Sequence, residues 1–342
     1  MDSLRFPPPE EAVPKTRVHP VFLPFQGCPT RCVFCAQTLQ TGNATRSLHE
    51  TFDEMRRDLA ALAAANAPPR ELAFYGGTFT CLPPEDQLAG IKIATAFRDR
   101  GLITLIRAST RPDALQRDHL ATLRKAGLNI LELGVQSFNN EALSASRRGY
   151  DEQTALDACR AVTEAGLTLG IQLLPGMPGM TPAMLPPDME RVAAAKPKYL
   201  RLYPCLVLKG TELAAKWEAK AYTPWSLDET IAALAPALLR AWDERIRVIR
   251  IGLAPEASLD NGGILAGPRH PSLGSLIRGR ALFLYITRYL EQRGQTAQRL
   301  ALPRRFQGEF WGHGNSLAAA YAKHGLTRAN VCWHDEEYCQ LD

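Results

Sequence analysis

The sequence predicts an α/β fold, in which a partial, split βα barrel is followed by a small C-terminal appendage. The 342 residues are 46% apolar and 22% charged, so the chain can bury a large core and is neither disordered nor fibrous. Apolar, β-branched or aromatic runs alternate with segments of helical periodicity, which is the pattern of repeated βα units. Six or seven such units occupy about 230 residues, fewer than the eight units that a closed barrel of about 250 residues contains.

The predicted strands are short apolar runs, beginning with residues 18–23. Strands joined by helices lie parallel, because each parallel return needs a crossover, and such strands are expected to be buried on both faces. The carboxyl ends of parallel strands meet at one edge, so functional groups are expected in the loops that follow them. The further predicted strands are 71–75, 103–107, 129–133, 168–174, 199–203 and 247–251.

The predicted helices fill the intervals between these strands. Gly127 and Gly166 each follow a helical segment and are placed to adopt the left-handed conformation just past a helix end. A strand begins soon after each glycine, as expected for a βα repeat. The predicted helices are 48–65, 84–100, 112–126, 151–165, 181–194 and 226–244.

The chain divides into an N-terminal extension of residues 1–17, the partial barrel at 18–255 and a basic C-terminal appendage at 256–342. In the appendage the alternation weakens, and helices are expected near 275–291 and 315–323. The chain has no apolar run near the roughly 18 residues of a membrane helix, and its start is acidic and Pro-rich. We therefore expect a cytoplasmic protein without a membrane partner.

The net charge of +5 is too small to indicate a nucleic-acid partner by itself, but it is unevenly distributed. Between Asn261 and Trp333 there are ten basic and two acidic residues, a net charge of +8, which leaves −3 for the rest of the chain. A basic module on a mildly acidic body is typical of polyanion binding, so RNA is a candidate partner of the appendage. A solvated charged face is the alternative.

Three of the eight cysteines, Cys28, Cys32 and Cys35, are clustered just past the first predicted strand. Thiolates at this spacing can converge on one centre. Three sulfurs are one fewer than a closed tetrahedral zinc site uses, whereas a 4Fe-4S cluster held by three cysteines leaves one iron open. A zinc site and a redox dithiol are the alternatives.

The spacing Cys-x3-Cys-x-aromatic-Cys, with Phe34 before the third cysteine, resembles the signature of the radical S-adenosylmethionine (SAM) superfamily. The resemblance implies that SAM binds the open iron through its amino and carboxylate groups, next to Phe34. It further implies that an electron from a donor such as flavodoxin or ferredoxin cleaves SAM to methionine and a 5′-deoxyadenosyl radical. The cofactor then supplies the difficult chemistry.

Two further motifs follow predicted strands and match the same family. Gly76, Gly77 and Thr78 come off the second strand, and the resemblance implies that this turn receives the methionine amino group of SAM. Ser109 and Thr110 end the third strand, where the family contacts the ribose. An ordinary turn and a helix cap are the respective alternatives.

Polar residues also end the fourth and fifth strands. Glu132, Gln136 and Ser137 are expected in buried surroundings, where polar groups need partners and a ligand is a reasonable one. Arg148 is a candidate to grip the methionine carboxylate, with surface ion pairing as the alternative. Gln172 is placed to face the adenosyl group.

The segments around Gly76, Gly134 and Arg148, and above all the string from Arg201 to Leu213, resemble the Elongator catalytic-subunit branch of this superfamily. Members of that branch modify RNA, including the wobble uridine of transfer RNA, with help from an acetyltransferase domain. Here the cysteine spacing is shorter, no region of acetyltransferase length follows Leu253, and Cys205 replaces the usual Thr. We therefore expect a radical SAM enzyme that modifies an RNA base without an acyl donor.

Two alternatives belong to other functional classes. The Gly-Val-Gln-Ser-Phe segment starting at Gly134 also resembles oxygen-independent coproporphyrinogen oxidase and its relatives, which act on a small metabolite. The other alternative is a non-catalytic protein that keeps the cluster only for structure: a metal-binding scaffold, a haem carrier or an RNA-binding protein. Gly76, Gly77 and Arg148 argue against it.

Cys205 and Tyr203 are the candidate catalytic residues beyond the cofactor motifs. A thiol at a strand end inside the barrel can donate a hydrogen atom to a substrate radical, and a phenol on the same face can act at a radical site. Simple burial and packing is the alternative for both side chains.

Overall fold

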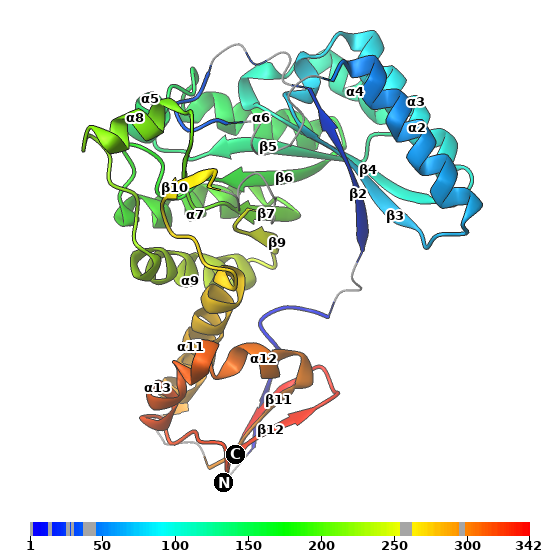
Figure 1. Cartoon of the computed structure of the whole chain (residues 1–342). Helices are drawn as coiled ribbons and strands as arrows, with labels where there is room; N and C mark the ends of the chain where they lie inside the picture. The colour runs from blue at the N-terminus through cyan, green and yellow to red at the C-terminus, as the bar shows by residue number, and fades with distance from the viewer. Residues whose placement is uncertain are drawn as a thin grey trace.

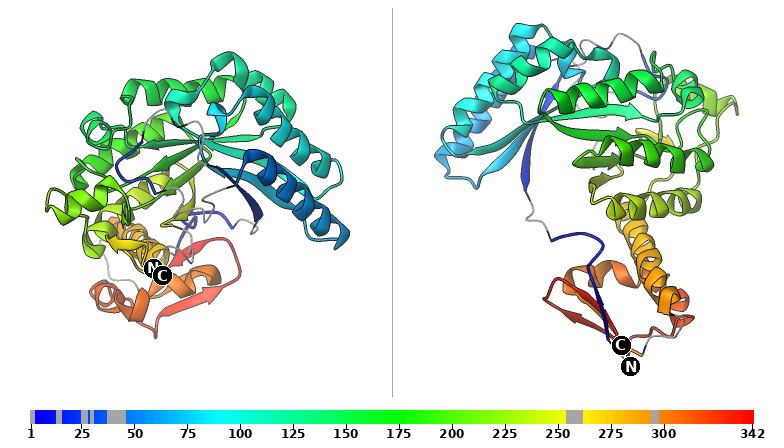
Figure 2. Two further views of the ribbon diagram at one scale, coloured as in Figure 1. Left: turned by 45° about the horizontal axis from the view of Figure 1, so that its top comes forward. Right: turned by 180° about the vertical axis from the view of Figure 1, so that it is seen from behind.

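The computed structural model describes residues 3–12, 16–24, 28, 31–36, 46–253, 262–293 and 298–342. Its centre is a seven-stranded sheet whose neighbouring strands are all parallel and follow the order of the chain. The sheet curls into an open half-barrel with helices on its outer face (Figures 1 and 2), which confirms the predicted partial barrel. The strands are β2 (Arg17–Leu23), β3 (Arg70–Gly76), β4 (Ile103–Thr110), β5 (Ile130–Gln136), β6 (Thr168–Leu173), β7 (Tyr199–Leu202) and β9 (Arg247–Ile251).

The outer helices begin at well-defined caps. Ser47 and Ser226 each form a capping box with the glutamate three residues later, which satisfies free N–H groups of the first turn. The predicted helices 112–126 and 181–194 each begin as a separate 3-10 turn, at Pro112–Ala114 and Pro182–Met184. The helices are α2 (Leu48–Ala64), α3 (Pro84–Arg98), α4 (Arg117–Ala126), α6 (Glu152–Glu164), α7 (Leu185–Ala195) and α9 (Leu227–Asp243).

Several short elements had no clear signal in the sequence, because each is too short to show a period. The helices α5 (Asn140–Ala145) and α8 (Glu212–Glu218) start at the caps Asn139 and Thr211. A 3-10 turn, η1, covers Phe79–Cys81, and β8 (Val207–Leu208) pairs antiparallel with β10 (Ile264–Ala266).

The two faces of the half-barrel differ in chemistry. On β3, Leu72 and Phe74 are fully buried in the apolar core, whereas Glu71 and Tyr75 line a cavity on the concave side. The expected burial on both faces holds at these positions, since Glu71 is 6% exposed and Arg107 4%, but the concave face is polar. The helices cover only the convex side, so the concave side can carry polar groups.

The C-terminal unit contains a second sheet that includes the N-terminal strand of the chain. The strand β1 pairs antiparallel with β13, and β13 pairs with β11 in the order β1-β13-β11-β12, so the two chain ends lie side by side (Figure 1). The predicted boundary at residues 255 and 256 lies outside the described residues. The elements are β1 (Leu4–Phe6), α11 (Leu273–Arg293), β11 (Leu300–Pro303), η4 (Arg304–Phe306), α12 (Gln307–Phe310), η5 (His313–Asn315), α13 (Ala318–Ala322), β12 (Val331–His334) and β13 (Cys339–Leu341).

Aromatic side chains build the core of this unit. Phe310 stacks on Tyr321 with ring centroids 4.0 Å apart, and both rings are fully buried. Trp333 meets Phe310 edge-on at 5.6 Å. Across the described helices, none combines the length and apolar character that crossing a bilayer requires.

Candidate active site

The concave face of the half-barrel encloses a cavity of about 630 Å³. Every strand of the large sheet contributes to its wall, and most of the contributing residues occupy alternate positions, as expected for one face of a pleated strand. The described part of the cysteine loop lines the cavity at the carboxyl ends of the strands. The strand residues that line it are Val18, Pro20, Phe22, Glu71, Tyr75, Gly76, Arg107, Ser109, Thr110, Gly134, Gln136, Gln172, Tyr199, Arg201, Arg247, Ile249 and Arg250.

The cysteine loop is held by backbone contacts with two short helices. Val33 donates its N–H to the carbonyl of Ser146, at the end of α5, over 3.3 Å. The N–H of Leu213 in α8 donates to the Val33 carbonyl over 2.8 Å. Both helices were missed in the sequence, yet together they fix the loop that carries the cysteines.

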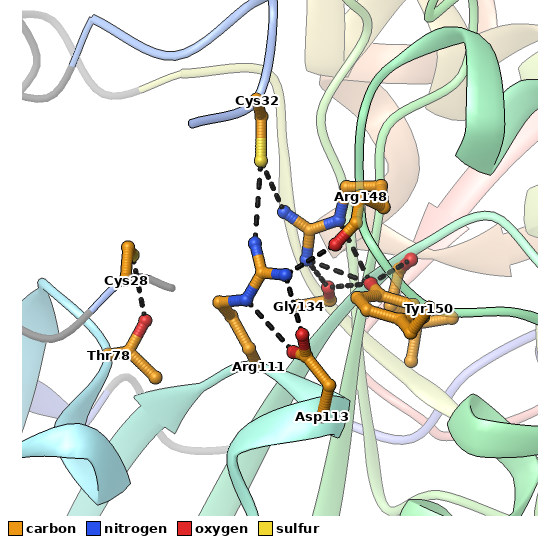
Figure 3. Close-up of polar contacts among 9 residues, drawn as sticks. Cys28, Cys32, Thr78, Arg111, Asp113, Gly134, Arg148 and Tyr150 are labelled. Atoms are coloured by element: carbon orange, nitrogen blue, oxygen red, sulfur yellow. Dashed lines mark hydrogen bonds and ion pairs between the residues drawn. The ribbon is translucent and has the colours of Figure 1, made fainter. Parts of the chain in front are cut away.

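Two thiols of the loop contact polar groups from the segments that follow β3, β4 and α5 (Figure 3). The Sγ atom of Cys28 lies 3.0 Å from the Oγ1 atom of Thr78. Cys32 Sγ accepts hydrogen bonds from Arg148 Nη1 at 3.0 Å and from Arg111 Nη1 at 3.5 Å. Two guanidinium groups therefore lie within hydrogen-bonding distance of this sulfur.

The donor set of the cavity suits an iron–sulfur cluster. Cys28, Cys32 and Cys35 all line the cavity. Three soft sulfur ligands are typical of such a cluster, and a cluster held by three thiolates leaves one iron open for another ligand.

Both arginines at Cys32 are buried and fixed by further contacts. Arg148 donates to the Gly134 carbonyl at 2.6 Å and to the Tyr150 hydroxyl at 2.8 and 3.0 Å. Arg111 forms a bidentate pair with Asp113 at 2.8 and 2.9 Å, and it also donates to the Arg148 carbonyl. Sequence reasoning missed Arg111, although it lies within the motif that ends the third strand.

All nine residues that the sequence analysis assigned to cofactor binding line this cavity. Two of them have unusual backbones: Gly76 has a φ of +94°, and a Cβ there would lie 2.7 Å from the Leu23 carbonyl oxygen. Gln136, a non-glycine residue, has a φ of +70°, a strained conformation that is common at functional sites. Their individual contacts with SAM stay predictions. The nine are Phe34, Gly76, Gly77, Thr78, Ser109, Thr110, Gln136, Arg148 and Gln172.

A network of buried charges lies in the wall of the cavity, with Glu132 at its centre. Arg201 binds the Glu132 carboxylate through Nε at 2.6 Å and Nη2 at 3.1 Å, and Arg107 Nη1 approaches it at 3.0 Å. Arg107 also pairs with Glu71, so two cations balance two anions. Burial raises the pKa of Glu132, but the charge and hydrogen bonds of Arg201, with the charge of Arg107, outweigh it and the net shift is downward.

Glu132 was expected to need a ligand as its partner, but the structure supplies protein partners instead. Gln172 adds a further hydrogen bond from Nε2 at 3.0 Å and also donates to Ser109 Oγ at 3.1 Å. Gly170 makes room for this carboxylate, because a Cβ at that position would lie 2.8 Å from Glu132 Cγ.

Two phenols extend the network into the cavity. Arg201 Nη1 donates to the Tyr203 hydroxyl at 3.0 Å, and Nη2 contacts the Tyr75 hydroxyl. Burial, followed by the negative charge of Glu132, raises the pKa of Tyr75 to about 12, so this phenol stays protonated at neutral pH. Tyr203 lines the cavity, as expected of a candidate catalytic residue.

Unlike Tyr203, Cys205 does not line the cavity. Its side chain is only 3% exposed, it is absent from the cavity wall, and burial raises the pKa of its thiol to about 12. Its backbone N–H donates to the Pro175 carbonyl at 2.8 Å. These surroundings favour the packing alternative for Cys205, because a buried thiol that does not reach the cavity has no path to a substrate there.

Comparisons with known proteins agree with this architecture. The chain is 29% identical over 190 residues to the tRNA uridine(34) acetyltransferase of Methanocaldococcus infernus, covering 54% of this chain and 33% of that protein. It is 28% identical over 235 residues to Elongator complex protein 3 of Homo sapiens, covering 60% and 42%. The chain therefore spans only about a third to two fifths of these relatives.

Solved structures show the same fold. An archaeal Elp3 from Methanocaldococcus infernus with an N-terminal deletion superposes with a TM-score of 0.59 at 24% identity, over 82% of this chain and 64% of that one. HydG, a maturase of the [FeFe]-hydrogenase, superposes with a TM-score of 0.50 at 13% identity, over 69% and 56%. At these identities the likeness concerns the fold alone.

The half-barrel with its cysteine loop defines an enzyme that depends on an iron–sulfur cluster. The family model "Radical SAM superfamily" matches residues 22–192, half of the chain, and the model "Radical_SAM C-terminal domain" matches residues 197–281. The chain belongs to the radical SAM superfamily, whose enzymes use a 4Fe-4S cluster and SAM.

Proposed function

We propose that the protein is a radical SAM enzyme that modifies a base of an RNA, with transfer RNA as the substrate class. The relatives named above as a tRNA uridine(34) acetyltransferase and Elongator complex protein 3 support this class. The observation that carries the proposal is the length of the cavity. It continues from the cysteine loop past the nine cofactor residues to Tyr199 and Arg247, at the amino ends of β7 and β9.

The walls of this extended cavity suit a planar base. Phe22, Tyr75, Tyr199 and Tyr203 provide aromatic faces, and Arg201 lies 4.9 Å from the centre of the Tyr75 ring. Unpaired bases stack on aromatic rings and guanidinium planes, and polar groups then read their edges.

The chain's own residues have distinct tasks in this proposal. Cys28, Cys32 and Cys35 hold the cluster, and the bound cluster and SAM supply radical chemistry by reductive cleavage of SAM. Arg111 and Arg148 fix the position of Cys32 Sγ and compensate its charge. The Tyr75 and Tyr203 hydroxyls are oriented by Arg201 to donate hydrogen bonds into the cavity.

The C-terminal segment is a weaker candidate for RNA binding than the net charge of +8 over residues 261–333 indicated. Residues 334–342 add four acidic residues and no Lys or Arg, which lowers the net charge of the segment from +8 to +4. Many of its arginines also form ion pairs within the protein, so they are less available for phosphates. These pairs are Arg278 with Glu10 and Glu309, Arg288 with Asp243, Arg304 with Asp335 and Arg305 with Glu337.

The proposal is tested by reconstituting the cluster without oxygen, adding SAM and a reductant, and measuring 5′-deoxyadenosine with and without bulk transfer RNA. We expect transfer RNA to increase 5′-deoxyadenosine several-fold and nucleoside mass spectrometry to detect a changed base. If RNA neither binds at moderate salt nor changes the rate of 5′-deoxyadenosine formation, the proposal of an RNA substrate is wrong. The alternative of a small-metabolite substrate is then favoured.

Two cysteine variants control this experiment. Cys32→Ala removes a thiol from the cavity and is expected to abolish iron loading and SAM cleavage. Cys159→Ala removes a thiol that is buried in α6 and does not line the cavity, so iron loading and SAM cleavage are expected to persist. Equal loss in both variants would overturn the assignment of the cluster ligands.

A further inference from the structure

A second cavity, of about 470 Å³, opens at the amino ends of β4 to β7, the edge of the sheet opposite to the cysteine loop. Its floor is formed by the first residues of these strands and by the loops that precede them. It is lined by Arg98, Leu105, Arg124, Lys125, Gly127, Leu128, Asn129, Ile130, Gly166, Thr168, Lys198 and Tyr199.

Four cations surround this cavity without a compensating acid. Arg98, Arg124, Lys125 and Lys198 line it, and no acidic residue does so in the described part of the chain. None of the four forms an ion pair with a described residue, in contrast to the arginines of the C-terminal unit. Four uncompensated positive charges around one hollow repel each other and make a favourable site for an anion.

Two of the guanidinium groups lie against glycines. Arg98 Nη1 donates to the Gly127 carbonyl at 3.1 Å. A Cβ at Gly127 would lie 3.0 Å from Arg98 Nη2, and one at Gly166 would lie 2.9 Å from Arg124 Cζ, so the missing side chain at each glycine makes room for a guanidinium. Arg98 is half-buried and fixed by its hydrogen bond, whereas Arg124, Lys125 and Lys198 are exposed and accessible to a ligand from solvent.

Helix dipoles explain part of this arrangement but not all of it. Arg98, Arg124 and Lys125 lie in the last turns of α3 and α4, where cations are favourable next to free carbonyl groups. Lys198 precedes β7 and caps no helix, yet it faces the same hollow. Helix dipoles account for the positions of three of the four charges. They do not explain why all four charges lie around one cavity, and this arrangement indicates a common ligand.

We propose that this cavity binds a backbone phosphate of the RNA substrate, an inference that rests on the proposed function. Tyr199 lines both cavities, so the two adjoin at the amino end of β7. An RNA that presents a base to the first cavity from this edge brings its backbone to the second. Guanidinium and ammonium groups bind phosphate through charge-assisted hydrogen bonds.

The test compares transfer RNA binding by the cluster-loaded protein and by a Lys125→Gln/Lys198→Gln double variant across a series of salt concentrations. Both side chains are exposed, so the fold is expected to persist. We expect about tenfold weaker binding, and a salt slope of log K reduced by about 2, because each lost phosphate contact removes nearly one unit. The matched control is Lys92→Gln/Lys209→Gln, two exposed lysines outside both cavities, which should retain affinity and slope.

The outcomes separate this inference from the proposed function. If the unmodified protein does not bind RNA, the proposed function fails. If it binds RNA and the Lys125/Lys198 variant binds with the same affinity and slope, the phosphate site is wrong while the RNA substrate stands. Inorganic phosphate that binds here without competing with RNA would also overturn the assignment. The single variant Lys198→Glu provides a second measurement: we expect it to weaken RNA binding more than about tenfold, because it replaces a phosphate-binding cation by an anion, and unchanged affinity would overturn the phosphate site.

Discussion

At the scale of single residues, the concave face depends on a balance of buried charge. Glu132 is 1% exposed, yet its carboxylate is bound by two arginines and a glutamine from β4, β6 and β7. Arg201 in turn orients both phenols that face the proposed substrate. A buried charge is tolerated only when it is paired and hydrogen-bonded, so each member of this network requires the others.

Replacing Glu132 by Gln should therefore destabilise the protein strongly. The change leaves buried positive charge uncompensated, and breaking such a pair lowers the free energy of unfolding by about 3–5 kcal/mol. Urea unfolding at pH 7 measures the effect. Glu212→Gln, which removes an exposed ion pair with Arg147, is the control and should change stability by less than about 1 kcal/mol. Similar losses in both variants would contradict the central role of Glu132.

At the scale of elements, a buried carboxylate ties the loop after β5 to α7. Asp188 accepts hydrogen bonds from Ser137 Oγ at 2.7 Å and from the Phe138 N–H at 2.8 Å. Ser137 was expected to face a ligand, but its side chain is occupied by this contact. The loop follows Gln136, the strained residue in the cavity wall, so α7 supports the site from behind.

Burial raises the pKa of Asp188 to about 6, which predicts a specific pH dependence. The unfolded chain ionises near pH 3.8 and the folded protein only near 6, so this group's contribution to stability falls as the pH rises through that window. Relative to the wild type, Asp188→Asn should therefore gain stability from pH 4 to pH 7, by on the order of 2–3 kcal/mol. Asp151→Asn should show the opposite sign, because hydrogen bonds from Thr154 lower the pKa of Asp151. Chemical unfolding at several pH values measures both, and parallel curves for wild type and Asp188→Asn would refute the prediction.

At the scale of the whole molecule, the N-terminal segment joins the C-terminal unit to the half-barrel. Phe6 stacks on Tyr289 of α11 with ring centroids 4.0 Å apart. Glu10 accepts hydrogen bonds from both Trp242 of α9 and Arg278 of α11. The segment that the sequence analysis assigned to an N-terminal extension thus completes a sheet and contacts two helices.

Phe6→Ala should loosen the C-terminal unit and leave the half-barrel intact. Phe6 is 5% exposed, and removing a buried aromatic ring lowers stability by about 3–5 kcal/mol. Hydrogen exchange should show faster exchange in α11, β11 and β13, with β3 to β6 unchanged. Leu4→Ala, on the same strand but 36% exposed, should have a small effect. Uniformly faster exchange across both parts would contradict a separate role for β1.

The sequence by itself determined the strands of the half-barrel, its long outer helices, and the three cysteines and nine predicted cofactor residues that line the cavity. Strand and helix periodicity are local properties, and a ligand spacing such as that of Cys28, Cys32 and Cys35 is readable along the chain. Alternation also predicts which residues within one strand share a face, such as Gly134 and Gln136 on β5, which both line the cavity.

Only the tertiary structure decided which distant residues meet. Arg111 and Arg148 converge on Cys32 from different loops, and β1 pairs with β13 across nearly the whole chain. Four cations from α3, α4 and the residue before β7 surround one cavity. The physical reason is that these contacts depend on how the sheet curls and how its strands are registered. Curl and register arise from packing between elements, and no local pattern encodes them.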